Sequence, residues 1–421
     1  MMRKYLLLFC LTFSLLFLAS CNFESDSDEK STDKINATEH GLSVENSGEE
    51  NSKALQALVD KVSISGGVIY IPAGEYLFCE NGRQTIGSHC IKMKSNVSIV
   101  GDGDKTVLCP IGNSEYGMDM FYYNDYLDLG EPSYLENCNF QDFVIDAAGS
   151  SCNVYTSAGK GFMFNLFKNC HWQRVTVKNT DATGFGVDCP TNGSIKECIA
   201  IGCGKAATEE NGGASGFGIG FGYCDDESII ISGCTAQNNK KFGFFLEHQG
   251  RFSDERYSAE KSLTFRISDC ISSGNLFNFG GICAMNTVYE RCRSFGAEKY
   301  GFYFENSTSS EVLESESDGE GQAAFAILHS DKDGNIPSSG IKFVSSSAKN
   351  SPVGVKIVGL AEASLMFDNL IDGCDLGNSP TAVYTEGKMR SLTLKNNFSQ
   401  TNNIELFAKT EELSDFDNSW N

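Results

Sequence analysis

Apolar and polar residues alternate in a short segment that recurs along the chain. Each copy begins with glycine, followed by an apolar, a variable, a second apolar and a second variable residue. Five copies follow this pattern, namely Gly161–Asn165, Gly184–Asp188, Gly216–Gly220, Gly243–Glu247 and Gly301–Glu305. Looser copies are Gly281–Met285, Ala324–Leu328, Gly354–Val358 and Ala382–Glu386. An alternation of period two predicts β-strands with one buried face.

A second pattern lies between these strands, in which a small polar residue follows an apolar residue at the third position. Its members are Leu135/Cys138, Phe167/Cys170, Ile195/Cys198, Ile231/Cys234, Ile267/Cys270, Tyr289/Cys292, Val312/Ser315, Val344/Ser347, Ile371/Cys374 and Leu394/Asn397. Successive small residues are roughly 22 to 36 positions apart. Repeats of this length indicate a solenoid, because each unit buries its apolar face only by stacking on the next. We therefore predict an all-β fold, a right-handed parallel β-helix with the small residues stacked in an internal ladder.

The segment before the repeats predicts a capping helix. Leu55, Leu58, Val59 and Val62 lie on one helical face. The next stretch, Gly66-Gly-Val-Ile-Tyr-Ile-Pro-Ala-Gly-Glu-Tyr76, together with this helix resembles the N-terminus of the pectate-lyase-like β-helix superfamily. That superfamily includes polysaccharide lyases, glycosidases, uronan epimerases and phage tailspikes. The resemblance implies a helix that covers the open end of the solenoid, and it implies a fold rather than a reaction.

The first 21 residues have the pattern of an export signal, with a basic start and an apolar run. The signal ends Leu18-Ala-Ser-Cys21 and resembles a bacterial lipobox, which implies cleavage before Cys21, lipidation of Cys21 and a membrane anchor. The alternative is an ordinary secretory signal. Asn22 favours placement at the outer membrane or cell surface. Residues 22–50 are polar and acidic, and we expect a disordered tether there rather than a packed arm. The β-helix domain then covers residues 51–410, and residues 411–421 form a frayed tail.

The net charge limits the kinds of partner that the protein can bind, and the positions of the cysteines indicate whether they form disulfides. A net charge of -22 and a pI near 4.6 argue against nucleic acid as a partner, because binding it requires a positive field. Of the 17 cysteines, those in the ladder should have nearly parallel Cα–Cβ bonds, which disfavours disulfides. We therefore expect reduced, buried thiols there. Cys79 and Cys90 flank a short loop, and either a disulfide or two free thiols fits an exported protein.

The last position of the aligned strands suggests a catalytic pair. Asp188 and Glu247 share one outward column two strands apart, with Gly220 between them, and Gly186 and Gly218 leave the neighbouring column bare. Two strand spacings are about 9.6 Å, near the upper end of the range of about 6.5–9.5 Å between the carboxylates of inverting glycosidases. We predict an acid/base pair above a glycine-floored trough that binds a polysaccharide. Alternatively, these are ordinary outward polar positions.

Other residues near this column are candidates for supporting roles. His248 and Tyr303 could transfer protons, and Arg251 could neutralise a substrate carboxylate. Asn165, Gly218, Gly220 and Glu305 are candidates for substrate binding. Asp225 and Asp226 are the candidate ligands of a calcium ion, which prefers oxygen donors.

No single reaction is favoured by the motifs. The chain lacks the acidic calcium cluster of pectate lyases, the Asp-Pro-His of alginate epimerases and an Asp-Asp pair of polygalacturonase type in a matching strand. One hypothesis is a polysaccharide lyase, hydrolase or epimerase. The other is a non-catalytic protein that binds glycan or acts as an adhesin or structural rod.

Overall fold

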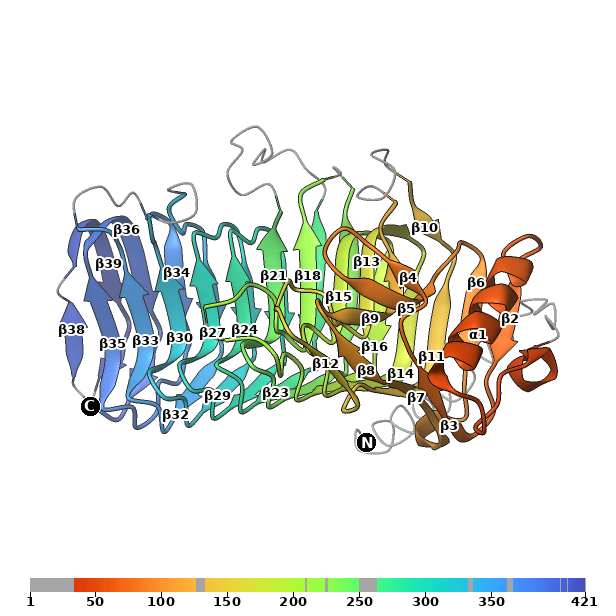
Figure 1. Cartoon of the computed structure of the whole chain (residues 1–421). Coiled ribbons are helices and arrows are strands. Elements are labelled where there is room, and N and C mark those ends of the chain that lie inside the picture. The colour runs from red at the N-terminus through yellow and green to blue at the C-terminus, as the bar shows by residue number, and fades with distance from the viewer. Residues whose placement is uncertain are drawn as a thin grey trace, which may run out of the picture. The chain divides into compact units, whose positions relative to one another are not determined.

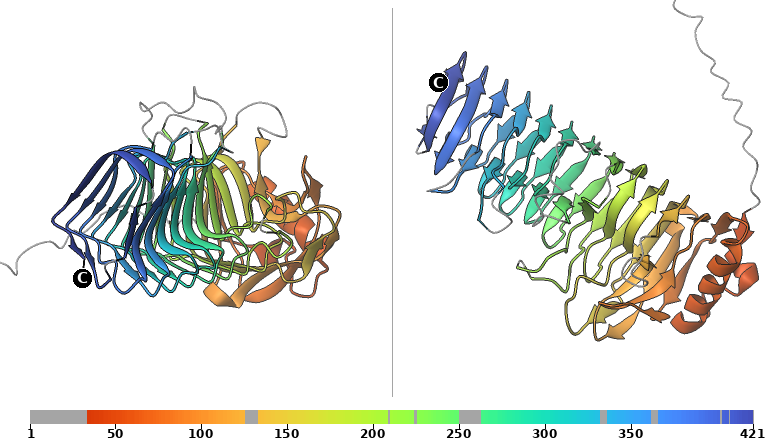
Figure 2. Two further views of the ribbon diagram at one scale, coloured as in Figure 1. Left: turned by 90° about the vertical axis from the view of Figure 1, so that its left-hand side faces the viewer. Right: turned by 90° about the horizontal axis from the view of Figure 1, so that it is seen from above.

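The computed structural model describes residues 34–125, 133–208, 210–223, 226–249, 263–331, 336–361, 366–401, 403–406 and 408–420. Residues 34–421 form one compact unit. The described part of this unit is a stack of coils in which strands of successive coils lie side by side in parallel (Figures 1 and 2). The predicted parallel β-helix is therefore confirmed.

One long parallel sheet contains the repeated strands and is called the site sheet below. In chain order it includes β13 (Phe162–Lys168), β15 (Phe185–Thr191), β18 (Phe217–Phe221), β21 (Phe242–His248), β24 (Phe277–Ile282) and β27 (Tyr300–Glu305). Phe185, Phe217 and Phe244 occupy one register position. Their buried rings stack with centroids 4.7 Å apart. The apolar second position of each repeat thus forms a continuous row inside the coil.

The glycine that opens each repeat also faces the interior, where the coil turns sharply. A Cβ atom on Gly161 would lie 2.5 Å from Cγ1 of Val177, and one on Gly184 would lie 2.8 Å from the sulfur of Cys203. Since real Cβ atoms do not approach other atoms so closely, only glycine permits this close approach of the opposite wall. The two residues that start each repeat therefore both face inward, which interrupts the alternation at this corner.

Two predicted alignments are wrong by a few residues. Phe244 pairs with Phe279, so the sixth copy is residues 278–282 and not Gly281–Met285. Asn278 takes the glycine position, and its side chain bonds to Ser294 across the coil. In the ladder, the N–H of Ser315 donates to Oγ of Ser346, so Ser346 occupies the rung assigned to Ser347. Serine runs and paired glycines fit either register, which is why the pattern misassigned both.

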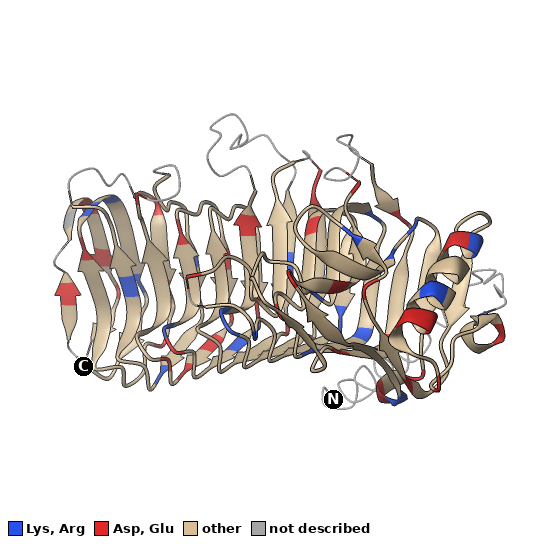
Figure 3. Ribbon diagram, in the orientation of Figure 1, with Lys and Arg blue, Asp and Glu red and all other residues tan. Residues whose placement is uncertain are grey.

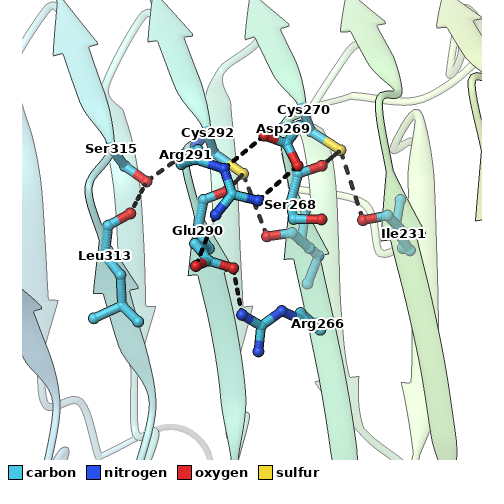
Figure 4. Close-up of polar contacts among 11 residues, drawn as sticks. Ile231, Arg266, Ser268, Asp269, Cys270, Glu290, Arg291, Cys292, Leu313 and Ser315 are labelled. Atoms are coloured by element: carbon cyan, nitrogen blue, oxygen red, sulfur yellow. Dashed lines mark hydrogen bonds and ion pairs between the residues drawn. The ribbon is translucent and has the colours of Figure 1, made fainter. Parts of the chain in front are cut away.

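The internal ladder is confirmed in its other described rungs. The backbone N–H of Cys198 donates to the sulfur of Cys234, and that of Cys234 donates to the sulfur of Cys270, each over 3.4 Å. The series continues from Cys292 to Ser315 at 3.1 Å (Figure 4). All described cysteines are free thiols, Cys79 and Cys90 included, so the disulfide considered for that pair is not formed here.

An asparagine ladder on the outside of one turn was not predicted. Asn137 donates to Asn96 (2.9 Å), Asn169 to Asn137 (3.2 Å) and Asn192 to Asn169 (2.7 Å) through their side-chain amides. Each has a positive φ between 52° and 66°, a left-handed conformation that asparagine tolerates better than most residues. The same residue type thus supports the turn and links successive coils.

Helix α1 (Gly48–Val62) covers the N-terminal end of the coil stack, as predicted (Figure 1). Ser47 and Glu50 form a capping box at its start, and the predicted apolar face is buried. The fold begins before the expected boundary at residue 51, because β1 (Ile35–Asn36) pairs with β2 (Gly67–Tyr70). Ala37 and Leu42 are buried there, and this burial orders a stretch that was assigned to the tether.

The last residues also extend the coil instead of fraying. Strand β39 (Lys409–Phe416) pairs in parallel with β36 (Lys388–Lys395), and β40 (Ser419–Trp420) pairs with β37 (Phe398–Ser399). These residues form strands because their backbone pairs with the preceding coil, although their acidic composition led us to predict a frayed tail. Among the described helices, none is long and apolar enough to cross a membrane.

Lys, Arg, Asp and Glu occur along the whole coil stack (Figure 3), and among the described ones only Asp119, Asp181, Glu227 and Glu320 are buried. Away from the site sheet, Arg291 bonds to Asp269 of the preceding coil, and Arg266 bonds to Glu290 of the following coil (Figure 4). These exposed pairs each contribute little to stability. They do neutralise part of the negative charge along the coil stack.

Candidate functional site

A pocket of about 280 Å³ lies on the outer face of the site sheet, over β15, β18 and β21. Its lining combines carboxylates, hydroxyls, one lysine and several glycines. The lining residues are Ser157, Lys160, Thr183, Gly186, Asp188, Gly212, Gly213, Ser215, Gly218, Ile219, Gly220, Phe245, Glu247 and Gln249. The predicted trough therefore exists, and it contains both members of the predicted carboxylate pair.

Asp188 and Glu247 stand on opposite sides of Gly220. Gly220 pairs directly with Glu247 in the next strand. From the other side, Oδ1 of Asp188 accepts a hydrogen bond of 2.7 Å from the N–H of Gly220. The Asp188 side chain thus leans one strand towards Glu247, so we expect the carboxylates to be closer than the full two-strand distance of about 9.6 Å.

The glycines form the floor of the pocket by leaving room for these side chains. A Cβ atom on Gly220 would lie 2.6 Å from Oδ1 of Asp188, and one on Gly186 would lie 2.5 Å from Cδ of Lys160. Gly218 pairs with Gly186 in the adjacent strand. Substituting Gly186 or Gly220 would displace the group that fills the space above it.

A polar column beside the carboxylates was missed by the sequence argument. Lys160, Thr183 and Ser215 directly precede the repeat glycines on three successive coils, and all three line the pocket. Strict alternation would turn these positions inward, but the glycine corner interrupts it and turns them outward. A signal did exist, since the equivalent positions on later coils are Phe242, Tyr300, Ala323 and Val353. The position changes from polar to apolar where the pocket ends.

Ser215 contributes a buried hydroxyl to the pocket lining. Its side chain is fully buried, and its Oγ has no hydrogen-bond partner among the described residues. Thr183 beside it accepts a hydrogen bond of 3.3 Å from the N–H of Ser215. A buried hydroxyl without a partner carries a desolvation cost, which a hydroxyl of a bound ligand would relieve.

The surroundings of Asp188 favour its protonated form. Burial raises the pKa of this carboxyl above its ordinary value, while the charge of Lys160 and the N–H of Gly220 oppose that rise. Raised carboxyl pKa values are a common property of groups that donate protons in catalysis. The direction of this shift suits Asp188 to act as an acid.

His248 does not reach the pocket. It extends strand β21 by one residue beyond Glu247, and neighbouring residues of a strand face opposite sides. Its side chain is fully buried inside the coil, edge-on to Phe221 with ring centroids 5.3 Å apart. The predicted proton-transfer role of His248 is therefore wrong.

Tyr303 and Glu305 lie outside the pocket lining. Tyr303 belongs to an outer aromatic cluster with Phe242, Phe245, Phe277 and Tyr300. Its ring packs against the rings of Phe277 and Tyr300, with centroids 4.8 and 5.5 Å away. Its hydroxyl bonds to Glu305. The cluster forms one wall of the pocket through Phe245 and contributes packing there.

Of the remaining predicted site residues, some lie outside the pocket lining and others lie outside the described part of the chain. Asn165 pairs with Asp188 on the preceding strand but is absent from the lining. Arg251 and Asp225 lie outside the described residues, and Asp226 is exposed in a turn. Within the described part of the chain, no group of three or more His, Cys, Asp or Glu side chains is arranged to hold a metal ion.

Comparison with known proteins gives one family match. A family model described as "Rhamnogalacturonase A/epimerase, pectate lyase-like" matches residues 34–254, the stretch that contains the capping helix and every residue that lines the pocket. No curated protein sequence matches the chain significantly.

Several solved structures share the fold at low sequence identity. The A-module of mannuronan C-5 epimerase AlgE4 from Azotobacter vinelandii is 17% identical, with a TM-score of 0.51 over 80% of this chain and 96% of that chain. The tailspike protein of E. coli bacteriophage HK620, in complex with a pentasaccharide, is 14% identical, with a TM-score of 0.58 over 88% and 67%. The catalytic domain of a GH87 alpha-1,3-glucanase variant, in complex with tetrasaccharides, is 12% identical, with a TM-score of 0.56 over 93% and 67%. Such identities establish a common architecture, and the chemistry has to be argued from the site itself.

Proposed function

Because the chain belongs to the rhamnogalacturonase A/epimerase, pectate-lyase-like family, we propose that it is a carbohydrate-active protein that processes a polysaccharide in the pocket over β15, β18 and β21. The observation that carries this proposal is the position of Asp188 and Glu247 on either side of Gly220 in one pocket. Structural neighbours named as an epimerase and a glucanase, and a tailspike with a bound pentasaccharide, support a glycan as the ligand.

Hydrolysis with inversion is the reaction that this geometry supports best. Asp188, whose pKa is raised by burial, would act as the acid and give its proton to the glycosidic oxygen as the bond from C1 to that oxygen breaks. Glu247 takes a proton from a water molecule whose oxygen bonds to C1 from the opposite face. Exchange of protons with solvent then restores both carboxyl groups. Lysis or epimerisation would use the same pair to remove, and for epimerisation to return, a proton on carbon.

A non-catalytic glycan-binding role is the second candidate. It is favoured by the absence of His248 and Tyr303 from the pocket, which leaves Lys160 as the only titratable side chain beside the two carboxylates in the described lining. A binding protein needs only the hydroxyls, the glycine floor and the aromatic wall of Phe245.

Activity and binding measured together separate these candidates. Residues 22–421 would be screened on uronans and neutral glycans for new reducing ends, for unsaturated products and for epimerised units by NMR. Asp188→Asn and Glu247→Gln should each lower turnover by about 10²–10⁴-fold while leaving the thermal midpoint close to that of the wild type. Binding that survives both substitutions, with no turnover of any polymer, would establish the non-catalytic role. Failure to bind any glycan would refute both.

We also propose that the protein is held on the cell envelope, at the outer membrane or cell surface, by lipid on Cys21. The support is the lipobox-like sequence that ends at Cys21 and the polar stretch that follows it. Full-length protein should partition into detergent and carry acyl groups at the mature N-terminus by mass spectrometry. Cys21→Ser should move it to the soluble fraction, and a soluble, unmodified wild type would contradict the anchor.

A further inference from the structure

A second pocket, of about 140 Å³, lies near the N-terminal end of the described chain and is called the hairpin pocket below. One side is formed by the hairpin of β4 (Gly82–Arg83) and β5 (Ser88–Lys92), which pair in antiparallel orientation. The other side is formed by the end of β8 (Gly112–Ser114) and by Glu115 and Tyr116, which follow it. No residue of this lining belongs to the lining of the pocket over β15, β18 and β21. The hairpin pocket is therefore a separate cavity.

Ser88 gives the hairpin pocket a buried hydroxyl that is not used by the fold. The residue is 4% exposed, and its Oγ has no hydrogen-bond partner among the described residues. Its backbone, by contrast, is fully bonded. The N–H of Ser88 donates to the carbonyl of Gly117 (3.0 Å), and its carbonyl accepts from the side-chain amide of Gln84 (2.8 Å). The main chain is thus fixed, and the hydroxyl can bond to a polar group that enters the pocket.

The other groups of the lining suit a neutral sugar unit. Tyr116 is 40% exposed, and its ring offers an apolar face while its hydroxyl offers a hydrogen bond. Arg83 donates to Glu80 over 3.3 Å at the rim, and both groups have further positions for sugar hydroxyls. With Glu115, the lining contains two carboxylates and one guanidinium. The excess of negative charge disfavours a sugar unit that carries an anion.

One short segment, residues 155–158, separates the hairpin pocket from the pocket over β15, β18 and β21. Ser157 lines the latter pocket, and the hydroxyl of Tyr155 donates to the carbonyl of Gly212 in the same lining over 2.6 Å. The next residue, Ala158, lies against Gly87 of the hairpin pocket, where an added Cβ would be 2.5 Å from the Cβ of Ala158. The two pockets are therefore neighbours, and an oligosaccharide can reach from one to the other.

We propose that the hairpin pocket is a second binding site for the polysaccharide, which holds a neutral sugar unit at a distance of a few units from the one beside Asp188 and Glu247. The inference rests on the proposed function, because it requires a glycan in the first pocket. Once one part of a chain is bound, contact of a second part is intramolecular, so two sites on one chain raise its affinity. Long chains should therefore bind more tightly than fragments that fill one pocket.

The test is isothermal titration with two series of oligosaccharides, one neutral and one of uronates, each from disaccharide to octasaccharide. Asp188→Asn serves as the background, so that no oligomer is cleaved during the titration. In the neutral series the affinity should rise about tenfold once an oligomer spans both pockets. Ser88→Ala and Tyr116→Ala should each remove most of this rise and leave disaccharide binding unchanged, whereas Tyr116→Phe should retain most of it.

Two further measurements separate a ligand contact from structural damage. Ser88→Ala removes a hydroxyl that has no partner, so the thermal midpoint should not fall. Phe367→Ala is the matched control for Tyr116→Ala, because Phe367 is 37% exposed and lines neither pocket. It should leave the dependence of affinity on length unchanged.

The outcomes distinguish this inference from the proposed function. If affinity does not rise with length, or if the rise survives both Ser88→Ala and Tyr116→Ala, the inference is wrong while glycan binding in the first pocket stands. A rise confined to the uronate series also contradicts it, because the charges of the hairpin pocket favour a neutral unit. If no oligosaccharide of either series binds, the proposed function fails and the inference fails with it.

Discussion

Glu320 is a carboxyl group buried inside the coil, at 2% exposure. It accepts hydrogen bonds from the hydroxyls of Ser294 (2.6 Å) and Ser317 (2.9 Å) and from the N–H of Ala297. Burial raises its pKa to about 7, although these hydrogen bonds oppose the rise. Neutral partners satisfy the oxygens but do not balance a charge.

This burial predicts a pH-dependent stability that is located at one residue. The unfolded chain should lose the Glu320 proton near pH 4.5, whereas the folded protein holds it to about pH 7. The free energy of unfolding should therefore decrease between these two pH values, by up to about 3 kcal/mol, and level off above them. Glu320→Gln should remove this decrease and raise the thermal midpoint at pH 8 relative to the wild type. Melting curves at pH 5 and pH 8 test this, and parallel pH profiles for the two proteins would contradict it.

Gly220 should be the residue where the smallest substitution has the largest effect on the site. In Gly220→Ala the new methyl group would meet Oδ1 of Asp188 and the amide of Gln249, so both side chains must move out of the pocket. We expect glycan binding to fall at least tenfold with a thermal midpoint within a few degrees of the wild type. Isothermal titration with the glycan identified in the screen measures the effect, and unchanged glycan binding would contradict it.

At the residue scale, the sequence predicted the parts of the site that obey strand alternation. Asp188, Glu247, Gly218 and Gly220 were placed correctly for that reason. Lys160 and Ser215 were missed because the inward-facing glycine corner shifts the alternation by one position, and no local rule gives that shift. His248 was misplaced because the strand continues through it, so the alternation that was applied to Glu247 had to be applied to its neighbour as well.

The asparagine ladder stabilises the turn at the scale of single elements. Asn169 both donates to Asn137 and accepts from Asn192, and its φ is 52°. Asn169→Gly keeps access to this conformation and loses two exposed hydrogen bonds, at a cost of about 1 kcal/mol. Asn169→Ala adds the steric cost of a left-handed alanine and should lose about 2 kcal/mol. Urea unfolding of the wild type and the two variants measures their free energies of unfolding. Equal losses of stability in the two variants would show that the left-handed backbone conformation does not contribute.

Helices and strands were predicted correctly where their amino-acid composition and the spacing of their apolar residues indicate the same structure. The face of α1 and its capping residues Ser47 and Glu50 follow local rules, so the helix was located closely. The segment at 34–50 and the last coil were misread, since their order comes from pairing with neighbouring coils and not from their own composition. The register slip at residues 278–282 has the same origin, because the asparagine at the glycine corner is accommodated by bonds to the opposite wall, such as the one that Asn278 donates to Ser294.

The whole molecule should behave as a protein without structural disulfides. The described thiols are free, and most are buried; burial raises the pKa of Cys109 to about 12 and that of Cys90 well above its ordinary value. A thiol reagent should therefore label the native protein slowly, first at the half-buried Cys79 and Cys152. Dithiothreitol should leave the thermal midpoint unchanged. A fall of several degrees would reveal a disulfide, for which Cys79 and Cys90 are the first pair to examine.

Each coil rests on the one before it, and the ladder partners are only 23 to 36 residues apart in the chain. The covered end, with α1 and the first strands, is also the part that leaves the ribosome first. A growing chain can therefore add one coil at a time onto a finished edge, without waiting for distant segments to be synthesised. Shortening the chain from its C-terminus would remove the newest coils and spare the pocket, whereas removing the first coil would take away the template on which all later coils form.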